Sequence, residues 1–494
     1  MKPMSSTVKI DPGRTSIKRE QLERVISFQD YIAIGFGAMI GVGWVMYAGK
    51  WLEQGGVLGA ALAFVLGGLL LVPIGKCYAE LTSALPLAGG EVAFTYKAFG
   101  PAVSFMTAWL LSLNYVAVAP FETIAIGALF EAIFPALARE ALYTLGGYPV
   151  AWSTILPGVA AGCWVVWINW RGAKDMARFQ TLVTAGLLIC TLLFCAAAFL
   201  KGDVGNLKPL FAGTGSLWVT VPASIASVIV VVPFFLSGFD CIPQAAEEAG
   251  LKVQPRKLGT AIVSVLLVGT AFYVIIILAL GLSTDSTKLS EILAQKAMLP
   301  MAEVFRVSFG YEWAAKLVLV AALFGLLTTL NGLFMAATRL LFAQGRGGLL
   351  PHWFAAVHPV HHTPMNAILF VGSIAIIGPF IGKTGLSVIV SSGATVFTMA
   401  LVITVAAALR LRRTCPEMKR PYRIGLPTMW LALLVGVFLV LLMVVPGSPG
   451  QLGPTEFAVI VIWASTGVLF NYLRRRHRDL SIREQNYLIL GAYK

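Results

Sequence analysis

The sequence predicts an all-α polytopic membrane protein, and three observations lead to this fold class. Hydrophobic residues make up 58% of the 494 residues and charged residues only 12%. A soluble domain of this size could not bury so much apolar surface. Apolar stretches of about 20 residues, long enough to cross a bilayer core of roughly 30 Å, recur along the chain. The basic residues gather in alternate connections between these stretches.

The apolar stretches predict about twelve transmembrane helices. The third, sixth and eighth are longer than a crossing needs, so we expect a tilt or a break in them. The connection 284–312 mixes polar and apolar residues, and we expect short helices there on the outer surface. The predicted spans are residues 29–52, 57–82, 101–133, 152–170, 174–200, 218–248, 259–283, 314–345, 364–383, 385–411, 427–446 and 453–473.

The distribution of lysine and arginine predicts the orientation. If the N-terminus lies in the cytosol, 28 of the 37 basic residues fall in cytosolic segments, which supports an even number of spans with both termini inside. We therefore expect a multi-pass protein of the cell (inner) membrane. The net charge of +14 then faces anionic lipid head groups, and a nucleic-acid partner is not expected. The oligomeric state does not follow from the sequence.

The first span contains residues that weaken a helix. Residues 35–44 read GFGAMIGVGW, with glycine at 35, 37, 41 and 43, and each glycine costs roughly 1 kcal/mol relative to alanine inside a helix. The glycines could form a close-packing face, since Gly37 and Gly41 have the spacing of one. They could also let the helix unwind.

A second interrupted span favours the unwound alternative. Residues 231–248 read VVPFFLSGFDCIPQAAEE, and the run around Ser237 and Gly238 is flanked by Pro233 and Pro243. Broken spans in corresponding places indicate two inverted repeats of five helices. The predicted organisation is a cytosolic segment 1–28, a first repeat 29–200, a second repeat 218–411, two further helices in 427–473, and a cytosolic tail 474–494.

Two facing breaks predict a site for a zwitterion. Non-helical backbone at membrane depth persists only where protein or a water-filled cavity satisfies it. The amide end of a half-helix attracts an anion and the carbonyl end attracts a cation. We expect the amides of Ile40, Gly41, Val42 and Gly43 to bind a carboxylate, and the carbonyls of Ala38, Met39, Phe235, Leu236 and Ser237 to bind an ammonium group.

Four stretches give the chain a resemblance to a known family. They are GFGAMIGVGW (35–44), FFLSGFDCIPQAAEE (234–248), NGLFMAATRLLFAQGRGGLLPHWFAAVHPVHHTPMNA (331–367) and LRRTCPEMKRPYRIG (411–425). Together they resemble the amino acid–polyamine–organocation permeases, of the bacterial amino acid permease type. The resemblance covers essentially the whole chain and implies the leucine-transporter-type fold, with helices 1 and 6 broken and two extra helices at the C-terminus.

The resemblance implies roles for individual residues. Phe234 or Phe235 would be the aromatic gate over the substrate, the amides of 40–43 would bind its carboxylate, and the carbonyls of 235–237 would hold its amine. Asn114 and Tyr115 of the third span complete the expected substrate-binding set.

Two carboxyl groups fall at membrane depth. A charged side chain there costs free energy, so its presence indicates a function. Asp240 directly follows the second break, and we expect it to titrate or to pair with a basic substrate. Glu122 lies in the third span without a basic residue nearby. It could carry a proton, contact an amine, or be a protonated acid bonded to a neighbouring helix.

Thr328 and Thr329 are candidate ligands for a sodium ion. In sodium-coupled relatives of this fold, hydroxyls at this place and carbonyls of the first span hold Na⁺. Proton-coupled members often place a lysine of the fifth span there, but the fifth span of this chain has none after Arg178. The alternative for the threonines is bonding to their own helix. The coupling ion is thus Na⁺ or H⁺, or there is none, and no other cofactor or metal is expected.

The expected function is transport of an amino acid by alternating access, with the substrate bound at mid-membrane between spans one and six. Alternatives are an amine or polyamine permease, for example for ethanolamine or putrescine, or an amino acid exchanger. Outside transport, a transporter-like nutrient sensor is the alternative. An enzyme is not expected, because no nucleotide loop, metal cluster or nucleophile–base pair is found in the sequence.

Overall fold

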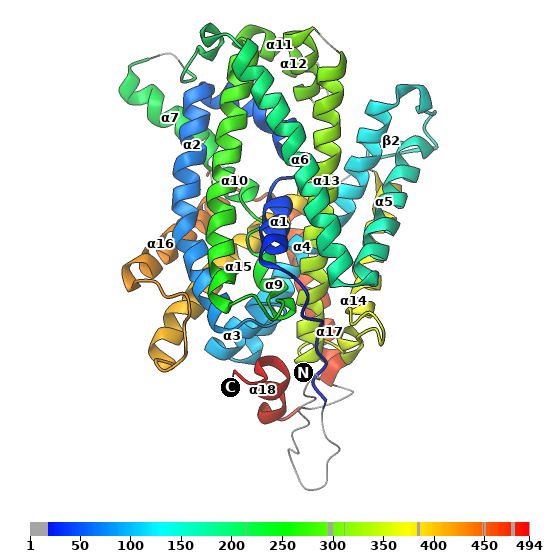
Figure 1. The fold of residues 1–494 in the computed structure, drawn as a ribbon, viewed down its shortest axis with the longest axis vertical. Helices are drawn as coiled ribbons and strands as arrows, with labels where there is room; N and C mark the ends of the chain where they lie inside the picture. Colours follow the sequence, from blue (N-terminus) through cyan, green and yellow to red (C-terminus); the bar gives the residue numbers. More distant parts are fainter. Residues whose placement is uncertain are drawn as a thin grey trace.

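The computed structural model is a bundle of long helices that run roughly along one axis (Figure 1). It describes residues 18–493 except 214, 295–299, 311, 383–385, 447, 449–450 and 476–479. Four predicted segments lie partly outside the described residues. They are the N-terminal segment (1–17), the last residue of the ninth span (383), the first residue of the tenth span (385) and the C-terminal tail (476–479 and 494).

The all-α membrane fold is confirmed. Among the described residues, eight helices are long and apolar enough to cross a membrane, and two shorter apolar helices stand where other spans are predicted. The number twelve and the division into two repeats stay predictions. The eight are α2 (Gly43–Ala84), α4 (Pro101–Ile133), α6 (Ala173–Lys201), α10 (Pro255–Ser283), α13 (Glu312–Arg346), α15 (Leu386–Thr414), α16 (Leu426–Val444) and α17 (Pro454–Arg475); the two are α7 (Leu217–Ile229) and α14 (Met365–Ile381).

The first two predicted spans share one element. α1 (Phe28–Met39) begins with a capping box of Ser27 and Asp30 and forms half of the first span. The other half is the start of α2, which turns into the second span at Gly56, where φ is +68°. A Cβ at this position would lie 2.7 Å from the Leu210 carbonyl oxygen. Glycine is therefore required there by conformation and by space.

Shorter elements cover the two ends of the bundle. α11 (Ser286–Ala294) and α12 (Pro300–Phe309) lie at the end opposite the termini (Figure 1) and confirm the short helices expected within 284–312. The sequence did not predict α3, α18 or the antiparallel β hairpin. The remaining elements are α3 (Glu91–Phe99), α5 (Trp152–Arg171), α18 (Ile482–Leu490), β1 (Tyr143–Leu145), β2 (Tyr148–Val150) and the 3₁₀ turns η1 (Pro135–Leu137), η2 (Val204–Leu207) and η4 (His352–Ala355).

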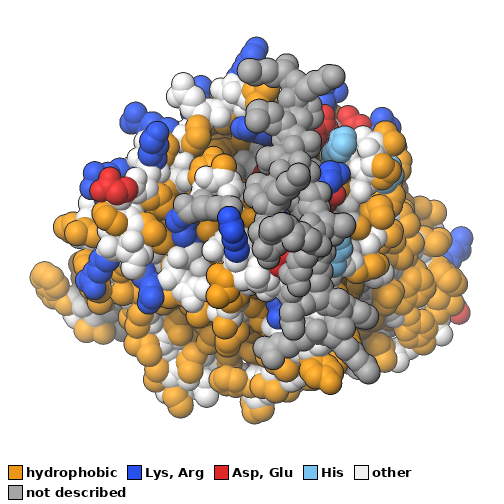
Figure 2. Space-filling view, turned by 90° about the horizontal axis from the view of Figure 1, so that it is seen from below, with side chains coloured by type: hydrophobic (Ala, Val, Ile, Leu, Met, Phe, Trp, Pro, Cys, Tyr) orange, Lys and Arg blue, Asp and Glu red, His pale blue; other side chains and the backbone are white. Residues whose placement is uncertain are grey.

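The end that carries both termini is basic. Seen from this end, lysine and arginine side chains gather on the face while hydrophobic side chains form its rim (Figure 2). Exposed basic residues lie at the start of α10 and just before it, and at the end of α15 and in the loop after it: Lys252, Arg256, Lys257, Arg410, Arg413, Lys419 and Arg423. The pattern is the one expected where a membrane protein meets anionic head groups.

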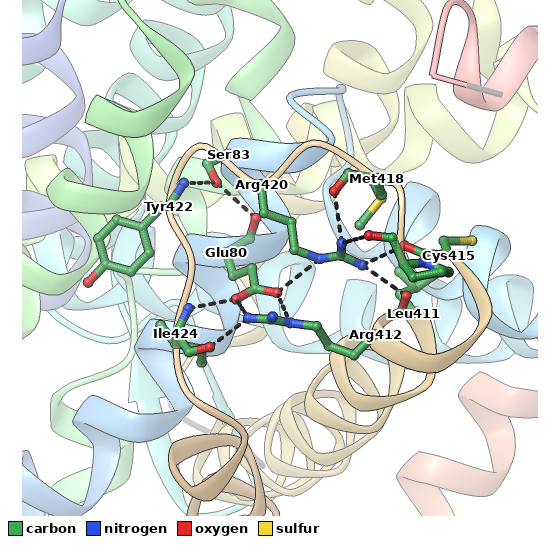
Figure 3. Close-up of polar contacts among 10 residues, drawn as sticks. Glu80, Ser83, Leu411, Arg412, Cys415, Met418, Arg420, Tyr422 and Ile424 are labelled. Atoms are coloured by element: carbon green, nitrogen blue, oxygen red, sulfur yellow. Dashed lines mark hydrogen bonds and ion pairs between the residues drawn. The ribbon is translucent and has the colours of Figure 1, made fainter.

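The basic loop after α15 is fixed to α2 by one buried carboxylate. Glu80 is 1% exposed and accepts two hydrogen bonds from Arg412, of 2.7 and 2.6 Å. It also pairs with Arg420 at 3.2 Å and accepts a hydrogen bond from the Ile424 amide (Figure 3). Arg420 in turn donates to the Leu411 carbonyl at the end of α15. Glu80 thus joins the second span, the tenth span and the loop that follows it.

We expect Glu80→Gln to lower the free energy of unfolding by about 3 kcal/mol, because it leaves two largely buried arginines without their counter-charge. The measurement is the melting temperature of the purified protein in detergent. Glu303→Gln is the control, since its pair with Arg306 is solvent-exposed and such surface pairs contribute little to stability. Equal melting temperatures for the two variants would contradict the assignment.

Candidate functional site

The first helix break lies where the glycine run predicts it. α1 ends at Met39 and α2 starts at Gly43. The Ile40 amide still donates to the Phe36 carbonyl of α1 at 2.9 Å, so the structure differs here from the prediction that this amide is free for a carboxylate. Among the described residues, the amides of Gly41 and Val42 have no hydrogen-bond acceptor, and the first amides of α2 have no intrahelical partner.

The second break follows the proline-flanked run. α8 (Val232–Phe235) stops before a turn, and α9 (Cys241–Gln244) and the 3₁₀ turn η3 (Ala246–Glu248) continue the span beyond it. Within the described part of the chain, no hydrogen bond reaches the carbonyl oxygens of Phe235, Leu236 and Ser237. These are the carbonyls that the sequence predicts to hold an amine.

The two breaks touch through Gly238. This residue has φ +121°, and a Cβ there would lie 2.6 Å from the Met39 nitrogen and 2.8 Å from the Ala38 carbonyl carbon. Only glycine meets both conditions. The end of α1 and the turn of the sixth span are therefore held in backbone contact.

A cavity of about 930 Å³ opens from the two breaks. It reaches Tyr148 of the β hairpin, at the end opposite the termini. Of the predicted site residues, five are buried and do not line it: Ile40, Tyr115, Leu236, Asp240 and Thr328. The predicted residues that line it are Ala38, Met39, Gly41, Val42, Gly43, Asn114, Glu122, Phe234, Phe235, Ser237 and Thr329.

Aromatic side chains cover the first break. Phe235 is buried, and its ring lies so close to Gly43 that a Cβ there would come within 2.5 Å of it. Its ring centroid is 4.7 Å from that of Trp51 and 6.1 Å from that of Tyr273. Phe234 is 37% exposed. Of the two predicted candidates, Phe235 therefore has the position of a cover over the break.

The two predicted membrane carboxyls have different surroundings. Asp240 accepts hydrogen bonds from the Tyr115 hydroxyl and, at 2.8 Å, from the Gly238 amide. Glu122 is 3% exposed, and its Oε2 has no hydrogen-bond partner among the described residues. Glu122 is eight residues beyond Asn114 on the same helix, which places it about 12 Å farther toward the open end of the cavity.

Thr328 and Thr329 lie against the first span. The Thr329 hydroxyl donates to the Gly37 carbonyl at 3.3 Å, whereas the Thr328 hydroxyl bonds to its own helix at the Phe324 and Gly325 carbonyls. The sodium site stays a prediction.

Gln180 of the fifth span occupies the space between these helices. Its Nε2 donates to the Ala33 carbonyl at 3.3 Å and to the Thr328 carbonyl at 3.1 Å, and its Oε1 accepts from Asn331. A cation that used the Ala33 and Thr328 carbonyls would have to displace this amide.

Ion pairs close the side of the breaks that faces the termini. Glu248 accepts two hydrogen bonds of 3.0 Å from Arg339, and both side chains are fully buried. Glu247 binds Arg346 at 2.6 Å and Arg19 of the N-terminal segment at 3.0 Å. The sixth span is thus fixed to α13 and to the N-terminal segment, and the cavity has a closed floor.

Three functional candidates were missed from the sequence. Gln180 lies in the space where the resemblance implies a lysine in proton-coupled members. A single glutamine in an apolar span does not stand out in the sequence. Glu91 follows two glycines in the connection between the predicted second and third spans, and it is fully buried. Gln244, also fully buried, donates to it. A carboxyl group beside a Gly-Gly pair is the only signal that could have directed attention to α3.

A bundle of apolar helices with two spans broken around a cavity defines a polytopic transport protein of the membrane. The model of the amino acid permease family matches residues 26–469, and the chain belongs to this family, part of the amino acid–polyamine–organocation superfamily that the resemblance indicated. Its members are permeases, so the prediction that the protein is not an enzyme is confirmed.

Two of the named relatives described here match nearly the whole chain, and a third matches a large part of it. The methylthioribose transporter of Bacillus subtilis (strain 168) is 27% identical over 496 residues, which is 97% of this chain and 99% of that protein. The branched-chain amino acid permease BcaP of the same organism is 26% identical, over 97% and 98% of the two chains. Cationic amino acid transporter 9, chloroplastic, of Arabidopsis thaliana is 31% identical over 70% of this chain and 59% of its own length.

We expect Gly238→Ala to abolish ligand binding, because the new Cβ separates the two breaks. Gly213→Ala is the matched control. Its φ of +115° imposes a comparable backbone cost of about 1–3 kcal/mol, but among the described residues its Cβ would meet only Thr220, at 3.6 Å. Ligand-induced thermal stabilisation of both purified variants is the measurement. If Gly238→Ala binds as the control does, contact between the breaks is not needed for the site.

Proposed function

We propose that the protein is a secondary active transporter that moves an amino acid across the membrane by alternating access, with the substrate bound between the two helix breaks. One observation carries the proposal. The amides of Gly41 and Val42 and the carbonyls of Phe235 and Ser237, which have no hydrogen-bond partner within the described chain, border the same cavity. Helix-start amides attract a carboxylate, and freed carbonyls attract an ammonium group. An α-amino acid uses both.

The asymmetry of the cavity supports alternating access. Its floor is closed by the buried pairs of Glu247 and Glu248, while the cavity extends to the hairpin at the other end. A transporter in one of its two end states has this form. We further propose that the basic, closed end faces the cytosol of a cell whose inner membrane holds the protein, with both termini inside.

The relatives support an amino acid cargo, since two of the three described above are named for amino acids. The name of the third, methylthioribose, shows that the family also carries other molecules. An amine or polyamine permease is the second candidate. Glu122 favours it, because this buried carboxyl lines the cavity without a hydrogen-bond partner for Oε2 among the described residues. Exchange of amino acids uses the same site.

Substrate class is tested by thermal stability against amino acids, their decarboxylated amines and methylthioribose. We expect amino acids to stabilise the protein, by about 2.7 kcal/mol at a hundredfold excess over Kd, and the matching amines not to do so, since they lack the carboxylate that the amides bind. Stabilisation by amines alone would transfer the binding role to Glu122, which lines the cavity. A stabilising ligand that shows no flux in liposomes would indicate a sensor.

We expect uptake into proteoliposomes to be unchanged when choline replaces sodium. The carbonyls of Ala33 and Thr328 are already bonded to the Gln180 amide, so a sodium ion would gain little there. The measurement is the initial rate of uptake of the stabilising amino acid in the two media. A clear loss of uptake without sodium would instead support the predicted site at Thr328 and Thr329.

A further inference from the structure

Two buried carboxyl groups lie below the floor of the cavity and are joined by hydrogen bonds. Asp240 accepts from the Tyr115 hydroxyl. The Gln244 amide donates to Glu91 Oε2 at 2.5 Å and to the Tyr115 hydroxyl oxygen at 3.3 Å. All four side chains are at most 1% exposed. Asp240, Tyr115, Gln244 and Glu91, here called the carboxyl cluster, come from three different elements.

The carboxyl cluster has no basic partner among the described residues. The other buried acids of the floor are neutralised: Glu80 by Arg412, and Glu248 by Arg339. Neither Asp240 nor Glu91 forms an ion pair within the described chain, and Glu91 Oε1 has no hydrogen-bond partner there. Two carboxylates in a shared, dry site cannot both be ionised at low cost. The arrangement therefore favours a bound proton.

The groups that face the cluster from neighbouring elements are neutral or already paired. α2 contributes the Tyr78 hydroxyl, and α9 the Cys241 thiol beside Asp240. On α1, the Tyr31 hydroxyl donates to the Ala245 carbonyl. On α13, the Arg339 guanidinium is used by Glu248. α15 adds the Thr404 hydroxyl, which does not titrate in water.

The cluster lies between the cavity and the closed end. Asp240 binds the Gly238 amide, and Gly238 touches the end of α1 at the cavity floor. Glu91 begins α3, which lies at the end of the molecule that carries both termini (Figure 1). Glu122, whose Oε2 has no hydrogen-bond partner among the described residues, lines the cavity instead. The cluster, between the cavity and the closed end, thus has a location from which a proton can be exchanged with each side in turn.

We propose that Asp240 and Glu91 share one proton and that this proton is the ion coupled to transport. The inference rests on the proposed function. One carboxylate oxygen forms an O–H bond with a proton that enters from the cavity, and the same proton leaves toward the closed end once that end has opened. No other bond changes and nothing is oxidised or reduced. The driving force is the proton gradient.

The titration of Glu91 suits this role. Burial, followed by the negative charge of Asp240, raises the pKa of Glu91 to about 8. Glu91 therefore holds a proton at neutral pH while it is buried, and water entering from the closed end would lower its proton affinity again. Proton release is thereby tied to opening of that end.

Glu91→Gln and Asp240→Asn test the proposal in proteoliposomes with L-leucine and L-lysine as probes. In the wild type, an inward proton gradient should drive accumulation of the transported probe. Both variants should lose this accumulation and retain counterflow exchange, which needs no gradient. Glu484→Gln is the control: Glu484 is a buried carboxyl in the capping box of α18, and glutamine preserves that cap.

Gradient-driven accumulation in Glu91→Gln equal to that of the wild type would overturn the proposal, as would a wild type that exchanges but ignores the gradient. Absence of counterflow in the wild type with either probe would count against the proposed function instead. In that case the proton site is tested by infrared spectroscopy, which needs no substrate. Infrared spectra of the wild type titrated through pH 8 should lose the C=O band of a protonated carboxyl, and Glu91→Gln should lack this change. An identical change in the variant would refute the site.

Discussion

Backbone groups that leave a helix inside the hydrocarbon core need partners within the protein or in a water-filled cavity, and the centre of this structure depends on that requirement. Ile40 keeps its bond to α1, the Val42 carbonyl accepts the amides of Val45 and Met46, and the Gly238 amide donates to Asp240. What remains unpaired among the described groups of the breaks includes the Gly41 and Val42 amides and the Ser237 carbonyl, and these residues border the cavity. The proposed site therefore consists of the backbone amides and carbonyls whose hydrogen bonds the fold does not satisfy.

The same requirement explains why the charged groups gather on one side of the breaks. Each buried guanidinium there faces a carboxylate, because an unpaired charge costs several kcal/mol in such a place. The pairs join elements that are far apart in sequence, as Glu247 joins the N-terminal segment to α13. An end held in this way is rigid while the pairs persist and can open only when several of them separate together. The open end has no comparable set of pairs among its described residues.

The features that could be predicted from the sequence are those that depend on neighbouring residues along the chain. Glycine and proline mark both breaks, and apolar runs of sufficient length mark the spans, so these features could be predicted from composition and spacing. The partners of buried polar groups could not. Gln180 contacts carbonyls about 150 residues away on either side along the chain, and Glu91 reaches Gln244 across 153 positions. Glu91 has the appearance of a loop residue in the sequence because nothing nearby indicates that α3 is folded under the bundle. The site of the substrate follows from the breaks, whereas the groups below it are determined by tertiary packing.

The proposed substrate site and the proposed proton site meet at one short segment of backbone. The Gly238 amide that donates to Asp240 belongs to the turn that presents the Ser237 carbonyl to the cavity and touches the Met39 nitrogen of the other break. A carboxylate accepts this hydrogen bond more strongly than a protonated carboxyl does. A change in the charge of Asp240 therefore changes how firmly the turn is held, and a ligand that orders the turn changes the proton affinity of Asp240 by the same free energy. No longer pathway is needed to link the two, because the groups that would bind substrate and proton are neighbours on a turn that only glycine can form.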